Sequence, residues 1–459
     1  MRVIVCGAGQ VGTSIAKQLA NEGNDVTVID QDPDRIQKIG DTLDVKAHIG
    51  FASHPTVLED VGAEDADMII AVTYSDEVNM VACQIAHSLF NVPTKIARIR
   101  HQNYLQSQWQ QLYRHDHMPI DVIISPEIEV ARAVVNRLHV PGAVDTIPFA
   151  GGKVKVIGVR CTLENPMISL SLTRIQEKIG DLKAVIVGLL RGKDFLIADE
   201  TLELLESDQL YFASDSKDVP AVMALFGYED REAQRVVIIG GGNIGLFLAK
   251  ELEAEDRDIR IKLLEVDTVR AEYVAERLQH TTVINGDALE QEILEEANVS
   301  AAETVIAVSN DDEVNILSSL LAKRFGAKRT ITLVNKTNSY APLVSSLGVD
   351  TIVNPRETTV SSILQHIRRG RILSVHSLCS GSAEVLEVEA VESSPVVGST
   401  VEELHLPYGI TLGLIIRNDE VIAPDADTTI KVGDHILLIT SANMVKTVEK
   451  TFSVKVDFF

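Results

Sequence analysis

The sequence is poor in aromatic residues and cysteine, and it contains no apolar run long enough to cross a membrane. Phe, Trp and Tyr make up 4% of the 459 residues, which is typical of α/β cores built from Val, Ile, Leu and Ala. The cysteines, Cys6, Cys83, Cys161 and Cys379, are far apart in apolar stretches, so we expect reduced core thiols in a cytosolic protein. The opening MRVIVCGAG predicts a buried strand, and no small-residue cleavage site of a signal peptide follows it.

Positive charge is scarce as well. The chain has 42 Lys and Arg residues against 66 Asp and Glu residues, and its formal net charge is −24. Such a surface repels phosphate backbones and anionic lipids, so nucleic acid is not an expected partner. The length and the 45% apolar content allow several domains with sizeable cores.

The first thirty residues carry a dinucleotide-binding pattern. An apolar strand from Arg2 to Cys6 leads without a gap into a G-x-G-x-x-G turn, an amphipathic helix and a second apolar strand that Asp30 closes. Glycines allow the tight turn and the close approach of a pyrophosphate to a helix N-terminus, and the acid can accept from ribose hydroxyls. A glycine turn that binds no ligand is the alternative. The predicted contacts are Gly7, Ala8, Gly9, Gln10, Val11, Gly12 and Asp30.

Strands and helices then alternate to about residue 138. The later strands are predicted at residues 45–49, 67–72, 95–99 and 121–124, and helices at 56–61, 76–90, 103–114 and 127–138. Six strands alternating with helices predict a parallel sheet that is covered on both faces. From about residue 145 to 227 the strands become short and alternating, which predicts a small α+β domain.

The opening pattern returns at Arg235, and this long-period repeat is the most informative feature of the chain. AVTYSDEVNM is echoed by AVSNDDEVNI, so that Asp76 matches Asp312 and Asn79 matches Asn315. The small domain repeats too, with Arg191 matching Arg417. The second set of predicted contacts is Gly240, Gly241, Gly242, Asn243, Ile244, Gly245 and Glu265.

These repeats predict an α/β chain of two Rossmann-like parallel-sheet domains, each followed by a small α+β domain. The predicted domains are 1–142 and 231–370 for the nucleotide-binding lobes, with 143–230 and 371–459 for the small lobes.

On GAGQVG with Asp30, GGGNIG with Glu265, the paired DEVN segments and the two small domains, the whole chain resembles the TrkA family. Members of this family are cytosolic regulatory subunits of bacterial Trk potassium uptake systems, with tandem RCK domains. The resemblance implies a protein that catalyses no reaction, binds NAD(H) and ATP or ADP, and forms a homo-oligomeric ring. That ring would lie at the inner face of the membrane under a potassium transporter subunit, which nucleotide occupancy would gate.

Features of catalytic sites are missing from the sequence. The small domains offer no clear acid or base beside a nicotinamide, and neither a Tyr-x-x-x-Lys pair nor a Walker A loop occurs. His115 and His117 lack a second cluster of metal ligands, so no metal site is predicted. Two other classes stay open: an NAD-dependent oxidoreductase or epimerase, and a dimerisation scaffold with vestigial crevices.

The two crevices are predicted to differ. Gln31-Asp32 follows Asp30 and Val266-Asp267 follows Glu265, so neither acid is expected to have a nearby Arg to hold a 2′-phosphate, and NAD(H) or ATP/ADP is favoured over NADP(H). Arg98 is predicted to clamp a phosphate in the first crevice, with a pairing to a surface acid as the alternative. It aligns with Val334 in the second copy, as Arg100 does with Lys336. ATP or NADH should therefore bind more tightly to the first lobe. The family resemblance implies that Asp287 of the second copy lies near the adenine, and the first copy has no carboxylate at this position.

Residues after the fourth strand of each lobe lie at the sheet edge where ligands of open α/β sheets bind. Here a plain turn is the alternative role. The helices at residues 127–138 and 357–367 lead out of the two lobes, and they are candidate hinge and dimer elements. The residues predicted at these strand ends are Thr73, Tyr74, Ser309 and Asn310.

Overall fold

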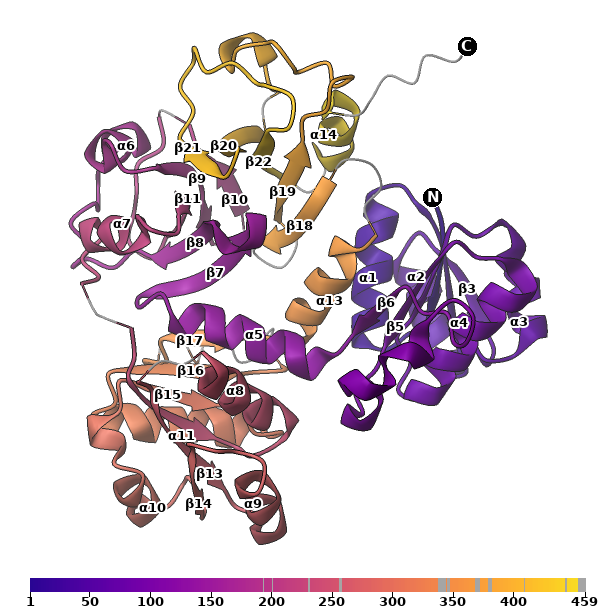
Figure 1. Ribbon diagram of the computed structural model, residues 1–459, viewed down its shortest axis with the longest axis horizontal. Coiled ribbons are helices and arrows are strands. Elements are labelled where there is room, and N and C mark those ends of the chain that lie inside the picture. Colours follow the sequence, from indigo (N-terminus) through magenta and orange to yellow (C-terminus); the bar gives the residue numbers. More distant parts are fainter. Residues whose placement is uncertain are drawn as a thin grey trace. The chain divides into compact units, whose positions relative to one another are not determined.

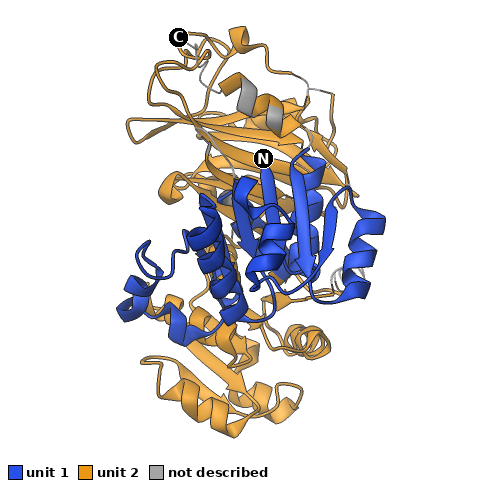
Figure 2. Cartoon of the chain, turned by 90° about the vertical axis from the view of Figure 1, so that its right-hand side faces the viewer, with its two compact units in different colours: residues 1–129, 356–368 blue, residues 130–355, 369–459 orange. Residues whose placement is uncertain are grey.

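Two compact units make up the chain in this computed structural model (Figure 2). One comprises residues 1–129 and 356–368, and the other residues 130–355 and 369–459. The structure describes residues 1–192, 194–199, 201–229, 232–255, 258–336, 344, 347–367, 372–378, 382–407, 409–441 and 444–452.

The first unit is built on a six-stranded parallel sheet in the order β3-β2-β1-β4-β5-β6 (Figure 1). Apart from end residues of β1 and β5, its central strands are buried, as a sheet covered by helices on both faces requires. The strands are β1 (Arg2–Cys6), β2 (Asp25–Asp30), β3 (Lys46–Ile49), β4 (Met68–Ala71), β5 (Thr94–Arg98) and β6 (Val122–Ile124). The helices are α1 (Gln10–Asn21), α2 (Pro33–Thr42), α3 (Pro55–Asp60) and α4 (Asp76–Phe90).

One predicted helix of this unit is wrong. Residues 103–114 form two 3₁₀ segments, Gln102–Leu105 and Ser107–Tyr113, instead of an α-helix. None of the residues in these segments is fully buried, and Tyr104, Leu105 and Tyr113 pack only partly against the core, so little apolar burial favours the α-helical form over the shorter turns.

The second unit contains a sheet of the same order, β14-β13-β12-β15-β16-β17, again with parallel pairs. The repeat in the sequence is therefore a repeat of the fold. The strands are β12 (Arg235–Ile239), β13 (Arg260–Glu265), β14 (Thr282–Asn285), β15 (Thr304–Ala307), β16 (Arg329–Leu333) and β17 (Thr351–Val353). The helices are α8 (Asn243–Ala254), α9 (Thr268–Ala275), α10 (Gln291–Glu296) and α11 (Asp312–Arg324).

Two antiparallel five-stranded sheets form the small domains, in the orders β10-β9-β11-β8-β7 and β18-β19-β22-β20-β21. Strand β7 was not predicted. The first set is β7 (Ala143–Phe149), β8 (Val154–Arg160), β9 (Ala184–Arg191), β10 (Asp194–Ile197) and β11 (Gln209–Asp215), with α6 (Leu172–Ile179) and α7 (Val219–Leu225). The second is β18 (Ile372–Leu378), β19 (Ala383–Glu389), β20 (Ile410–Arg417), β21 (Glu420–Ile422) and β22 (His435–Ser441), with α14 (Val445–Phe452).

One hydrophobic core joins the two small domains. Val156 and Tyr211 of the first sheet belong to the same buried cluster as Leu414 and Leu437 of the second. Outside this core each domain keeps a bidentate ion pair at the same place: Arg191 binds Asp208, and Arg417 binds Asp434, each with a closest N···O distance of 2.7 Å. Arg191 and Arg417, which were matched from the sequence, therefore make the same ion pair in the two small domains.

The helix that follows each Rossmann sheet packs in the unit of the other sheet. α5 (Pro126–Leu138) starts directly after β6, yet its buried residues from Val130 onward belong to the core of the second sheet. α13 (Pro355–Gln365) starts after β17, and Ile363 and Leu364 belong to the core of the first sheet. The two helices that were expected to lead out of the lobes therefore each pack on the sheet of the other lobe. The domain boundaries given from the sequence stay predictions.

Candidate functional site

Both glycine turns have the geometry of a phosphate-binding loop. Gly7 and Gly240 adopt φ values of 112° and 104°, which other residues rarely reach. A Cβ on Gly12 would lie 1.8 Å from the carbonyl oxygen of Gly7, so helix α1 can approach β1 only with glycine there. A Cβ on Gly9, by contrast, would meet no atom within 4 Å. The loop is closed by sterics on its inner side and open on the side where a ligand would bind.

The acid at the end of the second strand is held by this loop. One carboxylate oxygen of Asp30 accepts from the Ala8 N–H at 2.6 Å, and the other from the Asp32 N–H at 3.0 Å. In the second copy Glu265 accepts from the Gly241 N–H at 2.6 Å and from the Asp267 N–H at 3.0 Å. Both acids thus stand beside the first amides of the glycine turn, where a ribose next to a bound pyrophosphate would lie.

An arginine lies beside Asp30 in the first copy and beside the glycine turn in the second, contrary to the expectation that no arginine is near either acid. Arg35, on α2, has its Nη1 4.0 Å from an Asp30 oxygen. Arg270, on α9, donates from Nε to the Gly241 carbonyl at 2.7 Å and from Nη2 to Asn243 at 3.2 Å. Neither arginine directly follows its acid in the sequence, and the first turn of the next helix brings each guanidinium group back toward the loop. The absence of an arginine therefore no longer argues against NADP(H).

A buried asparagine fixes the end of the fourth strand in each copy. The amide oxygen of Asn79 accepts from the Thr73 N–H at 2.8 Å, and its nitrogen donates to the Arg98 carbonyl at 2.8 Å. Asn315 does the same for Ser309, at 2.8 Å, and for Leu333, at 3.1 Å. Because a Cβ on Gly7 would come within 3.1 Å of Thr73, this strand end adjoins the glycine turn.

These contacts correct the alignment of the two repeats by one residue. Asn79 bonds a carbonyl 19 residues on, whereas Asn315 bonds one only 18 residues on. Arg98 therefore corresponds to Leu333 and not to Val334. Arg100 corresponds to Asn335, since the backbone N–H groups of both donate to the aspartate that opens the preceding helix. The second copy still has no arginine at the position of Arg98.

Arg98 is a half-buried cation with one buried N–H group that has no hydrogen-bond partner among the described residues. It donates from Nη2 to the Thr73 carbonyl at 2.8 Å, and the unpaired group is its Nε–H. Burial, and then the neighbouring Arg100, lower the pKa of Arg98. A guanidinium whose buried Nε–H group is unpaired favours an anion as the missing partner.

Two further polar residues lie at the carboxyl-terminal ends of the strands of the first sheet and were not predicted from the sequence. Ser125 directly follows β6, and Glu127 lies in the first turn of α5. Ser125 Oγ and Glu127 Oε2 are buried without a hydrogen-bond partner among the described residues, while Glu127 Oε1 accepts from Arg100 Nε at 3.0 Å. The rule that selected Thr73, a polar residue directly after a parallel strand, would also have found Ser125.

The far ends of the two crevices differ in polarity. Asp287 follows β14 and caps its own turn by accepting from the Leu289 N–H at 2.9 Å. Phe51 takes its place in the first copy, 51% exposed and stacked on His54 at 5.1 Å between ring centroids. Tyr74 is 89% exposed. The first crevice thus offers aromatic faces where the second offers a carboxylate.

The other candidate groups do not form a reactive centre. His115 packs edge-on against His87 at 4.4 Å, and the described residues contain no group of three potential metal ligands. Burial raises the pKa of Cys83 and that of Cys161 to about 12, which keeps both as unreactive thiols, while Cys379 lies outside the described residues. In the part of the chain that is described, no helix combines the length and the apolarity needed to cross a membrane.

Comparison with solved structures supports the fold. A GsuK channel bound to NAD matches with a TM-score of 0.57 and 19% identity, covering 98% of this chain and 78% of that one. The GsuK RCK domain matches with a TM-score of 0.57 over 98% of this chain and 94% of the other, at 18% identity.

Comparison of sequences goes further. The TrkA-N domain matches residues 3–126 and 236–355, and the TrkA-C domain matches residues 385–453. The Trk system potassium uptake protein TrkA of Azorhizobium caulinodans is 48% identical over the whole of both chains, and that of Halomonas elongata is 39% identical over the same extent. With two TrkA-N domains and full-length relatives of this similarity, the chain belongs to the TrkA family of Trk system potassium uptake proteins.

Proposed function

We propose that this chain is a regulatory subunit of a potassium uptake system, and that its two crevices bind adenine nucleotides as signals without consuming them. The observation that carries the proposal is the duplicated loop: in both copies a glycine turn, open on one side, is joined through its amide to an acid at the ribose position. The sequence contains no Tyr-x-x-x-Lys pair of the kind that hydride-transfer enzymes place beside a nicotinamide, so binding is favoured over hydride transfer.

NAD(H) and ATP or ADP are the proposed ligands. The related GsuK fold has been solved with NAD, and the acids of both loops suit a ribose diol. In the first crevice the unpaired Nε of Arg98 favours a further phosphate, which supports a nucleoside triphosphate there. The ligand contacts around both loops are part of this proposal.

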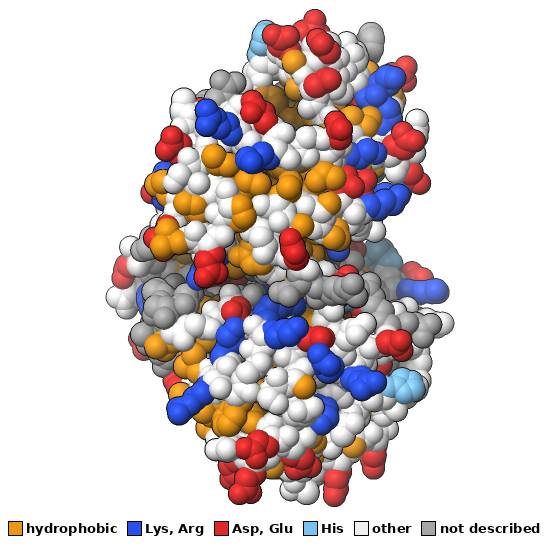
Figure 3. Space-filling view, turned by 90° about the vertical axis from the view of Figure 1, so that its left-hand side faces the viewer, with side chains coloured by type: hydrophobic (Ala, Val, Ile, Leu, Met, Phe, Trp, Pro, Cys, Tyr) orange, Lys and Arg blue, Asp and Glu red, His pale blue; other side chains and the backbone are white. Residues whose placement is uncertain are grey.

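A homo-oligomeric ring on the cytoplasmic side of a membrane-embedded transporter subunit is the proposed assembly. Val81 on α4 and Leu317 on α11 stand at matching positions and are 40% and 51% exposed, which suits contacts that repeat around a ring. Figure 3 shows further apolar side chains gathered on the face of the first small domain that carries α6 and α7. Two leucines of this domain, Leu163 and Leu205, are 71% and 43% exposed.

The test combines binding with transport. Isothermal titration with NADH, NAD⁺, ATP and ADP is measured for the full chain and for Asp30→Ala and Glu265→Ala, each of which should lose one site. Flux of a potassium analogue into vesicles holding the transporter subunit should then depend on nucleotide only when the chain is present. Turnover of NADH with alcohols, acids or sugars would support an oxidoreductase instead. If the wild-type chain bound none of the four nucleotides, the proposal would be refuted.

A further inference from the structure

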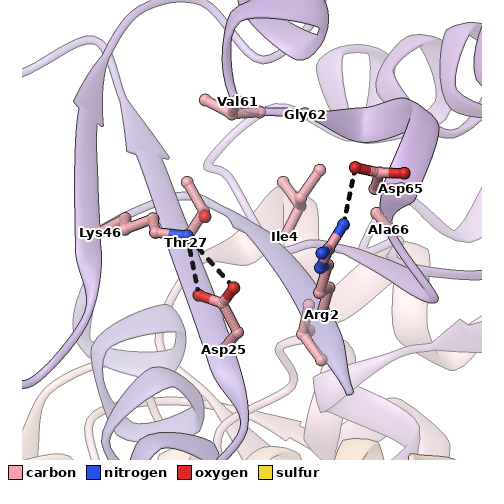
Figure 4. Close-up of a pocket in the computed structure, with 10 residues that line it drawn as sticks. Arg2, Ile4, Asp25, Thr27, Lys46, Val61, Gly62, Asp65 and Ala66 are labelled. Atoms are coloured by element: carbon pink, nitrogen blue, oxygen red, sulfur yellow. Dashed lines mark hydrogen bonds and ion pairs between the residues drawn. The ribbon is translucent and has the colours of Figure 1, made fainter.

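The two ends of strand β3 differ in chemical character. At its start, Lys46 pairs with Asp25 at 3.1 Å and lines a surface pocket in which Arg2 pairs with Asp65 at 2.6 Å (Figure 4). Both carboxylates at this edge of the sheet thus already have a cation of the protein as partner. The edge that binds ligands in an open α/β sheet is the opposite one, at the carboxyl ends of the strands.

At the carboxyl end of β3, two large apolar side chains are exposed beside the acid of the first crevice. Ile49, the last residue of the strand, pairs with Asp30, and Gly50 donates its N–H to the Asp30 carbonyl at 2.9 Å. Ile49 is 54% exposed, and Phe51 is 51% exposed. The Phe51 ring stacks on His54 with 27° between the ring planes. An exposed aromatic ring that is held in this way is a platform on which a further flat group can stack.

The second crevice has polar residues at both of these positions. Asn285 pairs with Glu265 in the same register, and Gly286 donates its N–H to the Glu265 carbonyl at 3.0 Å. Asp287 therefore stands in the place of Phe51. One oxygen of Asp287 accepts a backbone N–H of its own turn at 2.9 Å, which leaves the second oxygen for a donor of a ligand.

The glycine between the two positions fixes this corner of the fold in each copy. A Cβ on Gly50 would come within 2.8 Å of Val57 on α3, and a Cβ on Gly286 within 2.4 Å of Ile293 on α10. The following helix thus packs directly on the glycine in both copies. The residue after each glycine therefore leaves the sheet at the same point, so the difference between the two copies is one of side chain and not of backbone.

The two side chains differ in what they require of a base. Since the acid of each crevice suits the ribose, the attached base lies near the ends of the second and third strands. An aromatic ring binds a base through its π-face, which every purine has, so the groups on the edge of the base matter little. A carboxylate needs an N–H donor on that edge. Adenine offers its N6 amino group, whereas guanine and hypoxanthine carry the O6 carbonyl oxygen at the same place.

We infer that the first crevice takes purine nucleotides without discriminating between bases and that the second is specific for adenine, with Phe51 and Asp287 as the deciding residues. This inference rests on the proposed function and names the class of ligand for each crevice. Combined with the phosphate contact proposed for Arg98, it divides the recognition. The first crevice responds to the number of phosphates, and the second to the base. Guanine nucleotides would then act on the subunit through the first crevice alone.

Calorimetric titration of full-length variants with ATP and with ITP, its hypoxanthine analogue, tests the inference. In Glu265→Ala only the first site remains, and there the two dissociation constants should agree within about threefold. In Asp30→Ala only the second site remains, and ITP should bind about 10–100-fold more weakly than ATP. Equal ratios of the two constants at both sites would overturn the inference and leave the proposed function standing. A chain that binds ATP at neither site would overturn both.

Exchanged side chains locate the effect. Phe51→Asp, in the Glu265→Ala background, should create a preference for ATP over ITP, and Asp287→Phe, in the Asp30→Ala background, should remove it. Phe51→Ala should weaken both nucleotides by the same factor, about 5–100-fold, because the stacked face is lost. Phe51→Tyr keeps the ring and is the matched control, with affinities expected within about twofold of its parent. Unchanged affinities in both Phe51→Ala and Phe51→Asp would show that the ring does not face the base.

Discussion

Arg329 on β16 donates from Nη2 to the carbonyl oxygen of Leu138, at 3.1 Å, across 191 residues of sequence. Leu138 is the last residue of α5, and Nη1 of the same arginine reaches the Val140 carbonyl at 3.5 Å. A guanidinium at the carbonyl end of a helix satisfies groups that have no partner within the helix and interacts favourably with its dipole. The exchanged helix is thus held on the second sheet by its end as well as by its apolar face.

Replacing this arginine should loosen the last turn of α5. For Arg329→Met we expect amide exchange of residues 134–140 to become about 5–30-fold faster, as the loss of about 1–2 kcal/mol would give. Hydrogen exchange read by mass spectrometry is the measurement, because a chain with several domains need not unfold in two states. Arg324→Met, at an exposed position of α11, is the matched control, and an equal effect in both variants would contradict the role of Arg329.

Two glycines of the first turn should separate binding from folding. Gly9 has a φ of −70° and open space where a Cβ would lie, so Gly9→Ala should leave the melting temperature within about 1 °C while nucleotide binding to the first site is lost. Gly12→Ala places a methyl group 1.8 Å from a carbonyl oxygen and should destabilise the lobe by about 2–4 kcal/mol. Calorimetric titration and thermal unfolding check the pair. Retained affinity in Gly9→Ala would mean that the turn faces no ligand.

Arg98 and Leu333 occupy the same position in the two copies, and exchanging them tests the predicted difference between the crevices. Arg98→Leu should weaken ATP at the first site about 10–100-fold, the cost of about 1.5–3 kcal/mol for a charge-assisted contact. The affinity for ADP and NAD⁺ should fall by a smaller factor if Arg98 contacts the terminal phosphate of ATP. The reverse variant, Leu333→Arg, is read in an Asp30→Ala background, so that only the second site responds, and there it should tighten ATP. Equal losses for all nucleotides in Arg98→Leu would contradict a terminal-phosphate contact.

The parts of the site that lie in one continuous stretch could be predicted from the sequence. The glycine turns, Asp30 and Glu265 each follow from a strand, a turn and a helix in succession, because the local chain fixes their geometry. The DEVN segments were matched correctly too, and the structure shows why they are alike: Asn79 and Asn315 make the same backbone contacts.

The parts that depend on the third dimension could not be predicted. The spacing of apolar residues in an amphipathic helix predicts an apolar face, but it does not predict which of two equivalent sheets that face covers. The exchange of α5 and α13 between the two sheets therefore could not be predicted. The one-residue difference before β16 is hidden in a short loop, and only the contacts of the two asparagines expose it. Arg35 and Arg270 were overlooked because a helical turn separates them in the sequence from the residues they approach, Asp30 and Gly241.

His376 gives the chain a predictable dependence of stability on pH. Its ring packs edge-on against Phe149, 5.1 Å between centroids, where the two small domains meet. Burial lowers the pKa of His376 to about 4, below the value near 6.5 of an unfolded chain. Above pH 6.5 both states are neutral and the full stability is present. As the pH falls from 6.5 toward 4, the unfolded state binds the proton first, so stability is lost over this window.

The expected loss is modest, since the ring keeps some contact with solvent. A fully buried group with this shift would contribute about 3 kcal/mol, and partial exposure reduces the expectation to about 1–2 kcal/mol. Melting temperatures of wild type and His376→Gln are compared between pH 7.5 and 5. The variant should lose less stability over this range, because it has no imidazole to protonate on unfolding. His280→Gln, at an exposed histidine, is the control, and identical pH profiles for wild type and His376→Gln would show that the buried ring does not govern the loss.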